Sequence, residues 1–448
     1  MKSKKLDLKS SRYLGRIRGK VRRLSTGAIA AAERIAELAE PPMAEVKSSA
    51  VLERFLAANG FKVSRPWPDI PTAFRASAGV SRPRIALLAE YDALPDCGRR
   101  TGQWGHGCGH NLLGTAATVA GIAAADSLAH AGKGGRITVI GTPAEETLSG
   151  KVFLAERGAF RNFDAVLAWH PNAKTQVNLA GGAAMDSISF RFFGRTAHAA
   201  GAPHSGRSAL DAALLMDVAV NYLREHVPEN VRMHSVIPEG GKAPNVVPDR
   251  AEIWYYLRGR DRRQVDELRE RVVRCARGAA TATETRFSMT IHDCVTERIP
   301  NRALADMLDA ILRRFGPPKF TAADARAAGR ICRGKKYLMR IDQIVTEPGR
   351  ASSDEDNVSW FAPLGRISVA CVPEGTIVHH RQYAAMVRTP GAHRGMLRAA
   401  EVLAAGAVEL AVNKSLLARA KDEFKNNKRH KQYKLPLSST TPPVPDWS

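Results

Sequence analysis

The chain has few cysteines and no long uninterrupted hydrophobic segment. Its six cysteines are scattered, with no CxxC motif and no disulfide-like spacing, so we expect a protein of the reducing cytoplasm. No apolar run approaches the roughly 18 residues that a membrane span requires, so we expect no membrane segment. The basic N-terminus also lacks the apolar region and the cleavage site of a secretory signal.

Acidic residues are scarce as well, since 44 Asp and Glu face 67 Lys and Arg in a chain of 448 residues, giving a net charge of +23. The excess is partly local: residues 1–23 hold ten Lys and Arg against one Asp, and residues 421–434 hold six against two acids. Neither segment has regularly interleaved aromatics or a recognisable binding module, so we expect no specific nucleic-acid partner. A general attraction for anionic small molecules is the better interpretation.

The length and the hydrophobic pattern predict more than one domain. The apolar runs "RIALLAEYD", "RITVIGTPAEE" and "DAVLAWHP" alternate with helical stretches, which predicts an α/β fold with a mostly parallel sheet. From about Met185 the pattern becomes β-α-β-β-α-β, the ferredoxin-like arrangement, and the α/β pattern then resumes. We therefore expect four segments: a basic arm (1–28), the first part of the α/β domain (29–184), an inserted ferredoxin-like α+β domain (185–297), and the second α/β part with a Pro-rich tail (298–448).

Polar residues follow each of the three apolar runs at its carboxyl end. They are Glu90 and Asp92, then Glu145 and Glu146, then His170. In open parallel sheets this edge is where ligands bind. A pair of adjacent glutamates alone is most often a solvated loop. At a strand end, however, one can ligate a metal while the other acts as a general base.

The stretch "GHGCGHNLLG" adds Cys108 and His110. Taken alone, Cys-x-His could be a metal site, a redox thiol or an accident of a tight turn. A thiolate, imidazoles and a carboxylate are the ligands that borderline divalent metals prefer. Because this stretch occurs together with polar residues at successive strand ends, we favour the metal site.

Longer motifs extend this pattern along the chain: "LLAEYDALP", "GHGCGHNLLGTAA", "GTPAEE", "AWHP", "GRTAHAAGAPHSGRSALDA", "GGKAPNVVPDRAEIWYYLR" and "SSDEDNVSW". From about Ile29 to Ser438 the sequence resembles the dinuclear metallopeptidase and amidohydrolase family of aminoacylases and carboxypeptidase G. It is most similar to the subgroup containing the B-type subunit of p-aminobenzoyl-glutamate hydrolase. The resemblance implies a metallohydrolase catalytic domain with an inserted dimerisation domain.

The resemblance also implies a ligand set for two divalent ions, which could be Mn or Zn, with Co possible. Cys108 would bridge the two ions, and the remaining ligands would be His110, Glu146, His170 and a late histidine, for which His379 fits better than His380 or His393. Glu145 would act as the general base, and Asp92 would orient a ligand. Glu90 occupies a position that is a metal-binding histidine in many relatives, and we do not expect it to ligate.

The implied reaction is hydrolysis of an amide C–N bond in an N-acyl or N-aroyl amino acid or an unusual dipeptide. In a homodimer, His198 would reach the partner's site and stabilise the oxyanion. Asn245 and Arg258 are candidates to hold a substrate carboxylate. A hetero-partner subunit is a further possibility, and the alternative reaction is hydrolytic deamination of an aromatic amine at the same site.

Overall fold

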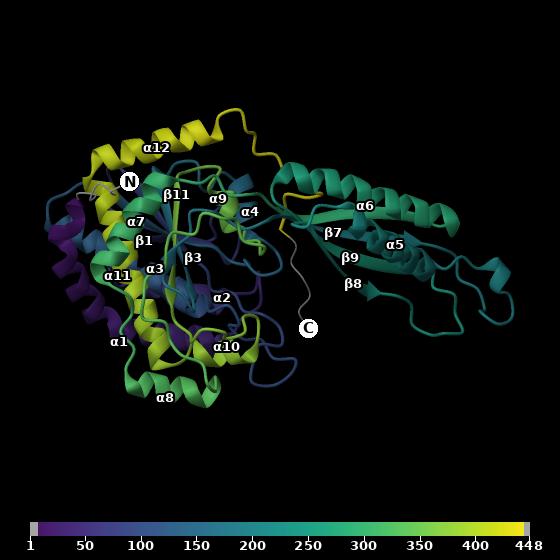
Figure 1. The fold of residues 1–448 in the computed structure, drawn as a ribbon, viewed down its shortest axis with the longest axis horizontal. Coiled ribbons are helices and arrows are strands. Elements are labelled where there is room, and N and C mark those ends of the chain that lie inside the picture. The colour runs from purple at the N-terminus through teal and green to yellow at the C-terminus, as the bar shows by residue number, and fades with distance from the viewer. Residues whose placement is uncertain (1–7, 443–448) are drawn as a thin grey trace.

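The computed structural model describes residues 8–442 and organises them around two β-sheets (Figure 1). The larger sheet has seven strands in the order β1-β2-β4-β3-β5-β11-β6. These strands are β1 Lys62–Ser64, β2 Phe74–Ala78, β3 Arg84–Ala89, β4 Arg136–Gly141, β5 Ala165–Asn172, β6 Gln176–Val177 and β11 Leu364–Ala370. The central strands β4, β3, β5 and β11 pair in parallel, and the outer strands are antiparallel. The predicted mostly parallel sheet is confirmed.

The central strands are covered on both faces, which explains why their sequences are apolar throughout rather than alternating. In β3, Ile85 and Leu87 belong to the core on one face, and Ala86 and Leu88 to the core on the other. The first core contains residues of α1 Leu14–Leu38, α2 Val46–Ala57, α3 His110–His130, α7 Arg302–Phe315 and α11 Pro390–Val412, and the second contains residues of α4 Gly150–Glu156.

Helix α3 lies at the centre of the first core, in contact with α1, α11 and β3. Within residues 8–442, it is the one helix long and apolar enough to cross a membrane. The search for uninterrupted apolar runs in the sequence did not find it, because polar residues interrupt its apolar ones. However, 83% of its apolar window is buried inside the protein. Protein side chains therefore already cover the apolar surface of this helix.

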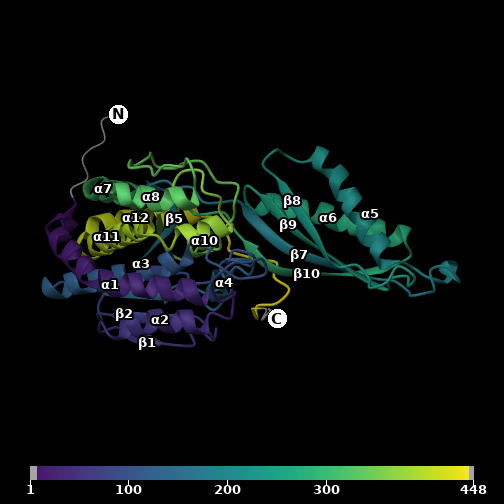
Figure 2. The same cartoon turned by 90° about the horizontal axis from the view of Figure 1, so that it is seen from below.

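Between β6 and α7 the chain forms a separate antiparallel sheet with the order β10-β7-β9-β8 (Figures 1 and 2). Its elements are β7 Ala184–Phe193, α5 Ala209–Leu223, β8 Arg232–Glu239, β9 Arg250–Gly259, α6 Arg262–Ala282 and β10 Arg286–Val295. Helices α5 and α6 contact each other and the sheet, and this unit has its own apolar core. The predicted ferredoxin-like insertion is therefore present.

The N-terminal segment differs from the basic arm predicted for residues 1–28. After the 3-10 turn η1 Lys9–Tyr13, helix α1 begins at Leu14, and it buries Ile17, Val21 and Ala28 in the first core. Apolar residues at this spacing form one face of a helix, so the many basic residues occupy its outer face. Part of the predicted arm, residues 1–7, lies outside the described residues.

The C-terminal segment joins the two domains. Helix α12 Lys414–Lys428 follows α11, and beyond it Leu435 and Leu437 pack against the core of the insertion. The backbone N–H of Ser438 donates to the carbonyl of Ile291, 3.2 Å away. This part of the predicted extended tail is thus held against the insertion, and residues 443–448 lie outside the described residues.

A buried carboxyl group also joins the insertion to the α/β domain. The hydroxyl of Ser149 donates to Oδ1 of Asp293, 2.8 Å away, and Oδ2 of Asp293 has no hydrogen-bond partner among the described residues. Burial raises the pKa of Asp293 to about 7, and Asp186 contributes in the same direction. Below about pH 7 the folded protein therefore favours the protonated form of this side chain.

We expect Asp293→Asn to change the pH dependence of stability. Between about pH 4 and pH 7 the folded state holds a proton on Asp293 that the unfolded state has released, so this group lowers the free energy of unfolding as pH rises. The asparagine does not titrate. The stability of the variant relative to the parent should therefore rise by about 1 kcal/mol per pH unit across this window. Urea unfolding at pH 5, 6 and 7 checks this, and a constant difference would contradict it.

Candidate metal centre

The candidate site lies at the carboxyl edge of the parallel strands, where three neighbouring strands end. Glu90 follows β3, Glu145 and Glu146 follow β4, and His170 lies near the end of β5. Helix α3 begins at the same edge, so Cys108 and His110 join these side chains. The topology therefore gathers residues that lie up to 80 positions apart in the sequence.

A glycine between Cys108 and His110 sets the geometry of this helix start. Gly109 is the N-cap of α3 and has a φ of +83°, in the left-handed region that favours glycine. A Cβ atom there would also lie 2.7 Å from Cγ of Pro171. The tight turn directs the thiol of Cys108 and the imidazole of His110 toward the same cluster. The turn is therefore part of the candidate metal site rather than an alternative to it.

Two groups of candidate ligand atoms share the Cys108 sulfur. One contains Cys108, His110 and His170, and the other contains Cys108, Glu146 and His379, each with its ligand atoms within 4.8 Å of one another. Sγ of Cys108 lies 3.4 Å from Nε2 of His170, and Nε2 of His379 lies 3.6 Å from Oε2 of Glu146. A sulfur common to two ligand groups is the arrangement that a bridge between two ions requires.

Two buried metal-ligand atoms of the cluster lack well-aligned hydrogen bonds, which fits a metal site. Asp92 lies 2.8 Å from Nδ1 of His110, and its other oxygen accepts from the backbone N–H of Glu146. Nε2 of His110 and Oε1 of Glu146 are buried and make no well-aligned hydrogen bond among the described residues, although Oε2 of Glu90 lies 3.2 Å from that nitrogen. Burial of such atoms is costly unless something binds them. A divalent cation suits an imidazole nitrogen beside a carboxylate oxygen.

The thiol also requires a nearby positive charge to ionise. Burial raises the pKa of Cys108 well above its usual range, and the carboxyl group of Glu146 raises it further. Burial lowers the pKa of His170 to about 3, which keeps its imidazole neutral, and its Nδ1 lies 2.7 Å from the carbonyl oxygen of Pro171. His170 therefore presents an unprotonated Nε2 beside the sulfur, as a metal ligand must.

Of the three late histidines, the structure brings His379 to the cluster. His380 is the N-cap of α10 Arg381–Met386, where its Nδ1 accepts from the backbone of Gln382. His393 lies in α11, 3.1 Å from Glu33. His379 itself has a φ of +56°, an uncommon conformation for a residue with a side chain, and its N–H donates to the carbonyl of Gly107.

Glu145 belongs to a third ligand group with His110 and Glu146. Burial and the nearby carboxylate of Glu90 together raise the pKa of Glu145 to about 7. A carboxyl group that exchanges its proton near neutral pH is suited to general acid–base catalysis. The two adjacent glutamates thus contact the cluster in different ways, because only Glu146 belongs to a group that contains Cys108.

Sequence reasoning missed a buried ion network behind the cluster. Nζ of Lys151 lies 2.7 Å from Oε1 of Glu90 and 2.6 Å from Oδ1 of Asp354, and all three side chains are buried. The other oxygen of Glu90 lies 3.2 Å from Nε2 of His110. The one available signal was a lysine within the apolar helix "GKVFLAE". Glu90 is therefore in direct contact with a candidate ligand.

The predicted substrate-binding residues, Asn245 and Arg258, and the predicted oxyanion donor, His198, are divided between the two ends of the insertion. At the junction with the α/β domain, a guanidinium nitrogen of Arg258 lies 2.5 Å from the hydroxyl of Ser352. His198 lies beyond the far end of β7, where its backbone forms an isolated β-bridge with Val246. Its Nδ1 accepts from the N–H of Gly201. Asn245 lies beside it, since its carbonyl accepts from Ala199. Strand β7 has ten residues and is about 33 Å long, so His198 and Asn245 lie far from the cluster of their own chain.

Comparisons with known proteins agree with this architecture. The chain is 35% identical to the B-type subunit of p-aminobenzoyl-glutamate hydrolase of Escherichia coli K12, over 92% of this chain and 95% of the relative. It is 32% identical to Xaa-Arg dipeptidase of Mus musculus, over 81% of this chain and 79% of that protein. A solved Bacillus subtilis structure, described as a dinuclear metal-binding peptidase of the M20 family, superposes with a TM-score of 0.60 at 18% identity and covers 87% of this chain and 99% of its own.

The family model described as Peptidase family M20/M25/M40 matches residues 86–401, from within β3 into α11. This range includes every residue of the cluster and the whole insertion. The match and the relatives confirm the resemblance drawn from the sequence motifs. The chain therefore belongs to peptidase family M20/M25/M40 and is an enzyme of the amidohydrolase and peptidase type.

Proposed function

We propose that the protein hydrolyses an amide C–N bond of an N-acyl or N-aroyl amino acid or an unusual dipeptide, with two divalent metal ions as cofactors. The observation that carries this proposal is the pair of ligand groups that share the Cys108 sulfur, with Glu145 beside them. The ligands would be Cys108, His110, Glu146, His170 and His379. The ions could be Mn, Zn or Co, since this mixed donor set suits each of them.

When bound, such ions lower the pKa of a water molecule and polarise an amide carbonyl. The residues of the chain do the remaining work. Glu145 accepts a proton from the attacking water and donates it to the leaving nitrogen, which a carboxyl group with a pKa near neutrality does well. Asp92 holds the Nδ1 proton of His110 and so keeps Nε2 directed at the cluster.

The names of the relatives and the position of Arg258 support the proposed substrate class. By their names, the relatives act on p-aminobenzoyl-glutamate, Xaa-Arg dipeptides and N-acetyl-cysteine, all of which carry an amide bond and a carboxylate. Arg258, near Ser352 at the domain junction, is suited to bind that carboxylate through its planar guanidinium. The relatives give no support to deamination of an aromatic amine.

A homodimer would supply His198 and Asn245 to each site. Helix α5 exposes apolar side chains at helical spacing, and the edge strand β8 exposes two more. These are Leu214, Leu215, Val218 and Tyr222 of α5, and Val236 and Ile237 of β8. Pairing two copies along this edge would bury the stripe under two-fold symmetry. His198 would then stabilise the oxyanion at the partner's site.

Two further proposals concern partners and location. Relatives of this chain are named as the two different subunits of p-aminobenzoyl-glutamate hydrolase, the A type and the B type, so a hetero-partner is compatible with this function. All six cysteines are unpaired, and five of them lie outside the candidate ligand set. Free cysteines persist in a reducing compartment, which supports the cytoplasm.

Metal analysis and an amide panel test the proposed function. The purified protein should contain two divalent ions per chain. With Mn or Zn it should release a free amine and a carboxylate from p-aminobenzoyl-glutamate, from N-acyl amino acids or from dipeptides. Removal of the ions with a chelator should abolish this activity, and the same ion should restore it. A protein that binds two ions but cleaves no amide in the panel would overturn the proposed reaction.

Mixing two inactive variants tests the role of His198 in the dimer. Glu145→Gln lacks the base, and His198→Ala lacks the proposed oxyanion donor. If His198 acts on the partner's site, one site in each mixed dimer regains both groups. After exchange of equal amounts, about a quarter of all sites, and so about a quarter of the parent turnover, should return. If His198 acts within its own chain, mixing restores nothing.

A monomeric control completes this test. Leu215→Glu together with Tyr222→Glu places charges on the exposed stripe of α5 and should prevent pairing, as measured by light scattering. When these changes are added to both inactive variants, mixing should restore no activity. Recovery in such a monomeric background would contradict the proposed interface.

A further inference from the structure

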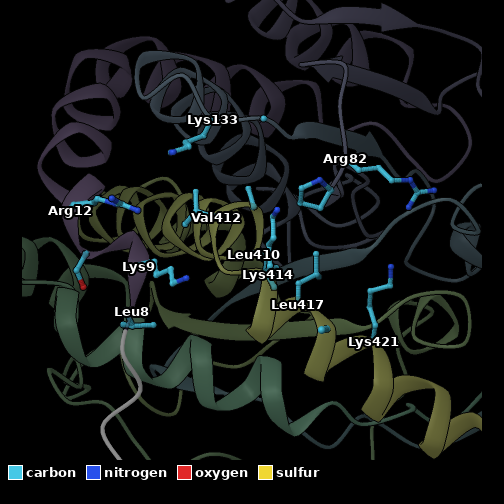
Figure 3. Close-up of a pocket in the computed structure, with 15 residues that line it drawn as sticks. Leu8, Lys9, Arg12, Arg82, Lys133, Leu410, Val412, Lys414, Leu417 and Lys421 are labelled. Atoms are coloured by element: carbon cyan, nitrogen blue, oxygen red, sulfur yellow. The ribbon is translucent and has the colours of Figure 1, made fainter.

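A hollow lies at the edge of the large sheet opposite the metal cluster (Figure 3). We call it the basic hollow, because its walls include six cationic side chains, those of Lys9, Arg12, Arg82, Lys133, Lys414 and Lys421, and no acidic one among the described residues. Its volume is about 870 Å³. Arg82 precedes β3 and Lys133 precedes β4, whereas the residues of the cluster follow these strands. Because β3 spans about 20 Å, the two sites are separate.

A buried contact holds the N-terminal side of the hollow in place. The backbone N–H of Ser10 donates to Oε2 of Glu409, 2.5 Å away, and the amide of Asn413 donates to the other oxygen of Glu409. All three residues are buried. Lys9 and Arg12, on either side of Ser10, are therefore anchored beside the junction of α11 and α12, as Figure 3 shows.

The charges of the hollow are only partly balanced. Asp164 accepts from Arg82 at 3.0 Å and from Lys421 at 2.7 Å, so one carboxylate offsets one of the two positive charges on that side of the hollow. Within residues 8–442, no ion pair involves the other four cations, Lys9, Arg12, Lys133 and Lys414. Like charges around one hollow repel each other and raise the local concentration of anions.

The hollow also has an apolar wall, formed by Leu8, Pro83, Val412 and Leu417. Its volume falls within the range of small-molecule sites, which is about 300–1,000 Å³. A carboxylate would balance one of the four free cations, while each phosphate group carries up to about two negative charges. A ligand with several phosphates and an apolar ring therefore matches both the charge and the wall.

We propose that the basic hollow binds a small organic polyphosphate, with the chemistry of a nucleoside triphosphate. Its phosphates contact the free cations of η1, α12 and the loop before β4, and its ring packs on the apolar wall. This site is independent of the hydrolytic centre and of the function proposed for that centre. Part of the high positive charge of the chain would then serve to bind one specific ligand, rather than to attract anions in general.

Calorimetric titration with ATP and with inorganic tripolyphosphate, at about 0.15 M salt, tests the proposal. Arg12→Glu with Lys133→Glu should weaken ATP binding by at least about tenfold. The matched control is Lys62→Glu with Lys319→Glu, which changes the net charge equally at exposed positions outside the hollow. It should change ATP affinity by less than about twofold. The Lys9→Ala and Lys414→Ala pair gives a second test that reverses no charge.

Each result decides one part of the proposal. Tighter binding of ATP than of tripolyphosphate supports the apolar wall, and equal binding overturns that part. Equal weakening by the hollow variants and the control would show that net charge alone attracts the anion, which overturns the site. No binding of ATP by the parent protein would also overturn it.

Discussion

Glu145→Gln should lower turnover by about a thousandfold or more while leaving the metal content unchanged. The amide has the size of the carboxyl group but accepts no proton at neutral pH, so the attacking water loses its base and the leaving nitrogen loses its acid. General acid–base catalysis by one side chain contributes about 10²–10⁴-fold, and Glu145 is proposed to act in both steps. Steady-state kinetics together with metal analysis of the same preparation measure both quantities.

The neighbouring glutamate provides the matched control. Glu146 belongs to the group with Cys108 and His379, and Glu146→Gln should therefore lose metal as well as activity. Glu145 also lies within 4.8 Å of donor atoms of His110 and Glu146, so ligation by Glu145 is the competing assignment. Loss of metal from Glu145→Gln would favour that assignment and contradict its role as the base.

The parts of the site that could be predicted from the sequence are those that depend on short, local sequence patterns. Polar residues at the ends of β3, β4 and β5 converge because parallel strands end at one edge of a sheet, and a glycine turn brings Cys108 beside His110. The insertion was predictable for the same reason, since its six elements follow one another without interruption. Local patterns were therefore enough for the fold and for most of the cluster.

Other features depend on contacts between distant segments. Lys151 and Asp354 are 203 positions apart, and no spacing rule pairs them. The distance of His198 from its own cluster likewise depends on the direction of β7. The start of α1 is a different case. Its apolar residues have helical spacing, but the density of basic residues around them masks that pattern.

Lys151→Met should destabilise the folded protein by about 3–5 kcal/mol. Lys151 is fully buried, and its ammonium group touches the carboxyl groups of both Glu90 and Asp354. Despite burial, which acts in the other direction, Lys151 lowers the pKa of Glu90 to about 2, so Glu90 is ionised in the folded state. Methionine has a similar length but no charge, and it would leave that carboxylate buried without its partner. Urea unfolding of the metal-free proteins measures this, because bound metal would add its own stabilisation.

The loss of a partly exposed lysine and a neutral triple variant show whether burial of the charge is the cause. Lys421 lies 2.7 Å from Asp164, but 40% of its side chain is exposed, so Lys421→Met should cost about 1 kcal/mol or less. Adding Glu90→Gln and Asp354→Asn to Lys151→Met removes the unpaired charge and should recover part of the lost stability.

If Lys151→Met lowers the free energy of unfolding no more than Lys421→Met does, removal of Lys151 leaves no uncompensated buried charge. Glu90 would then be protonated or solvated, and its contact with His110 would need another explanation. If the predicted difference is found, the network supports the cluster from behind, because the same carboxylate that pairs with Lys151 lies 3.2 Å from Nε2 of His110.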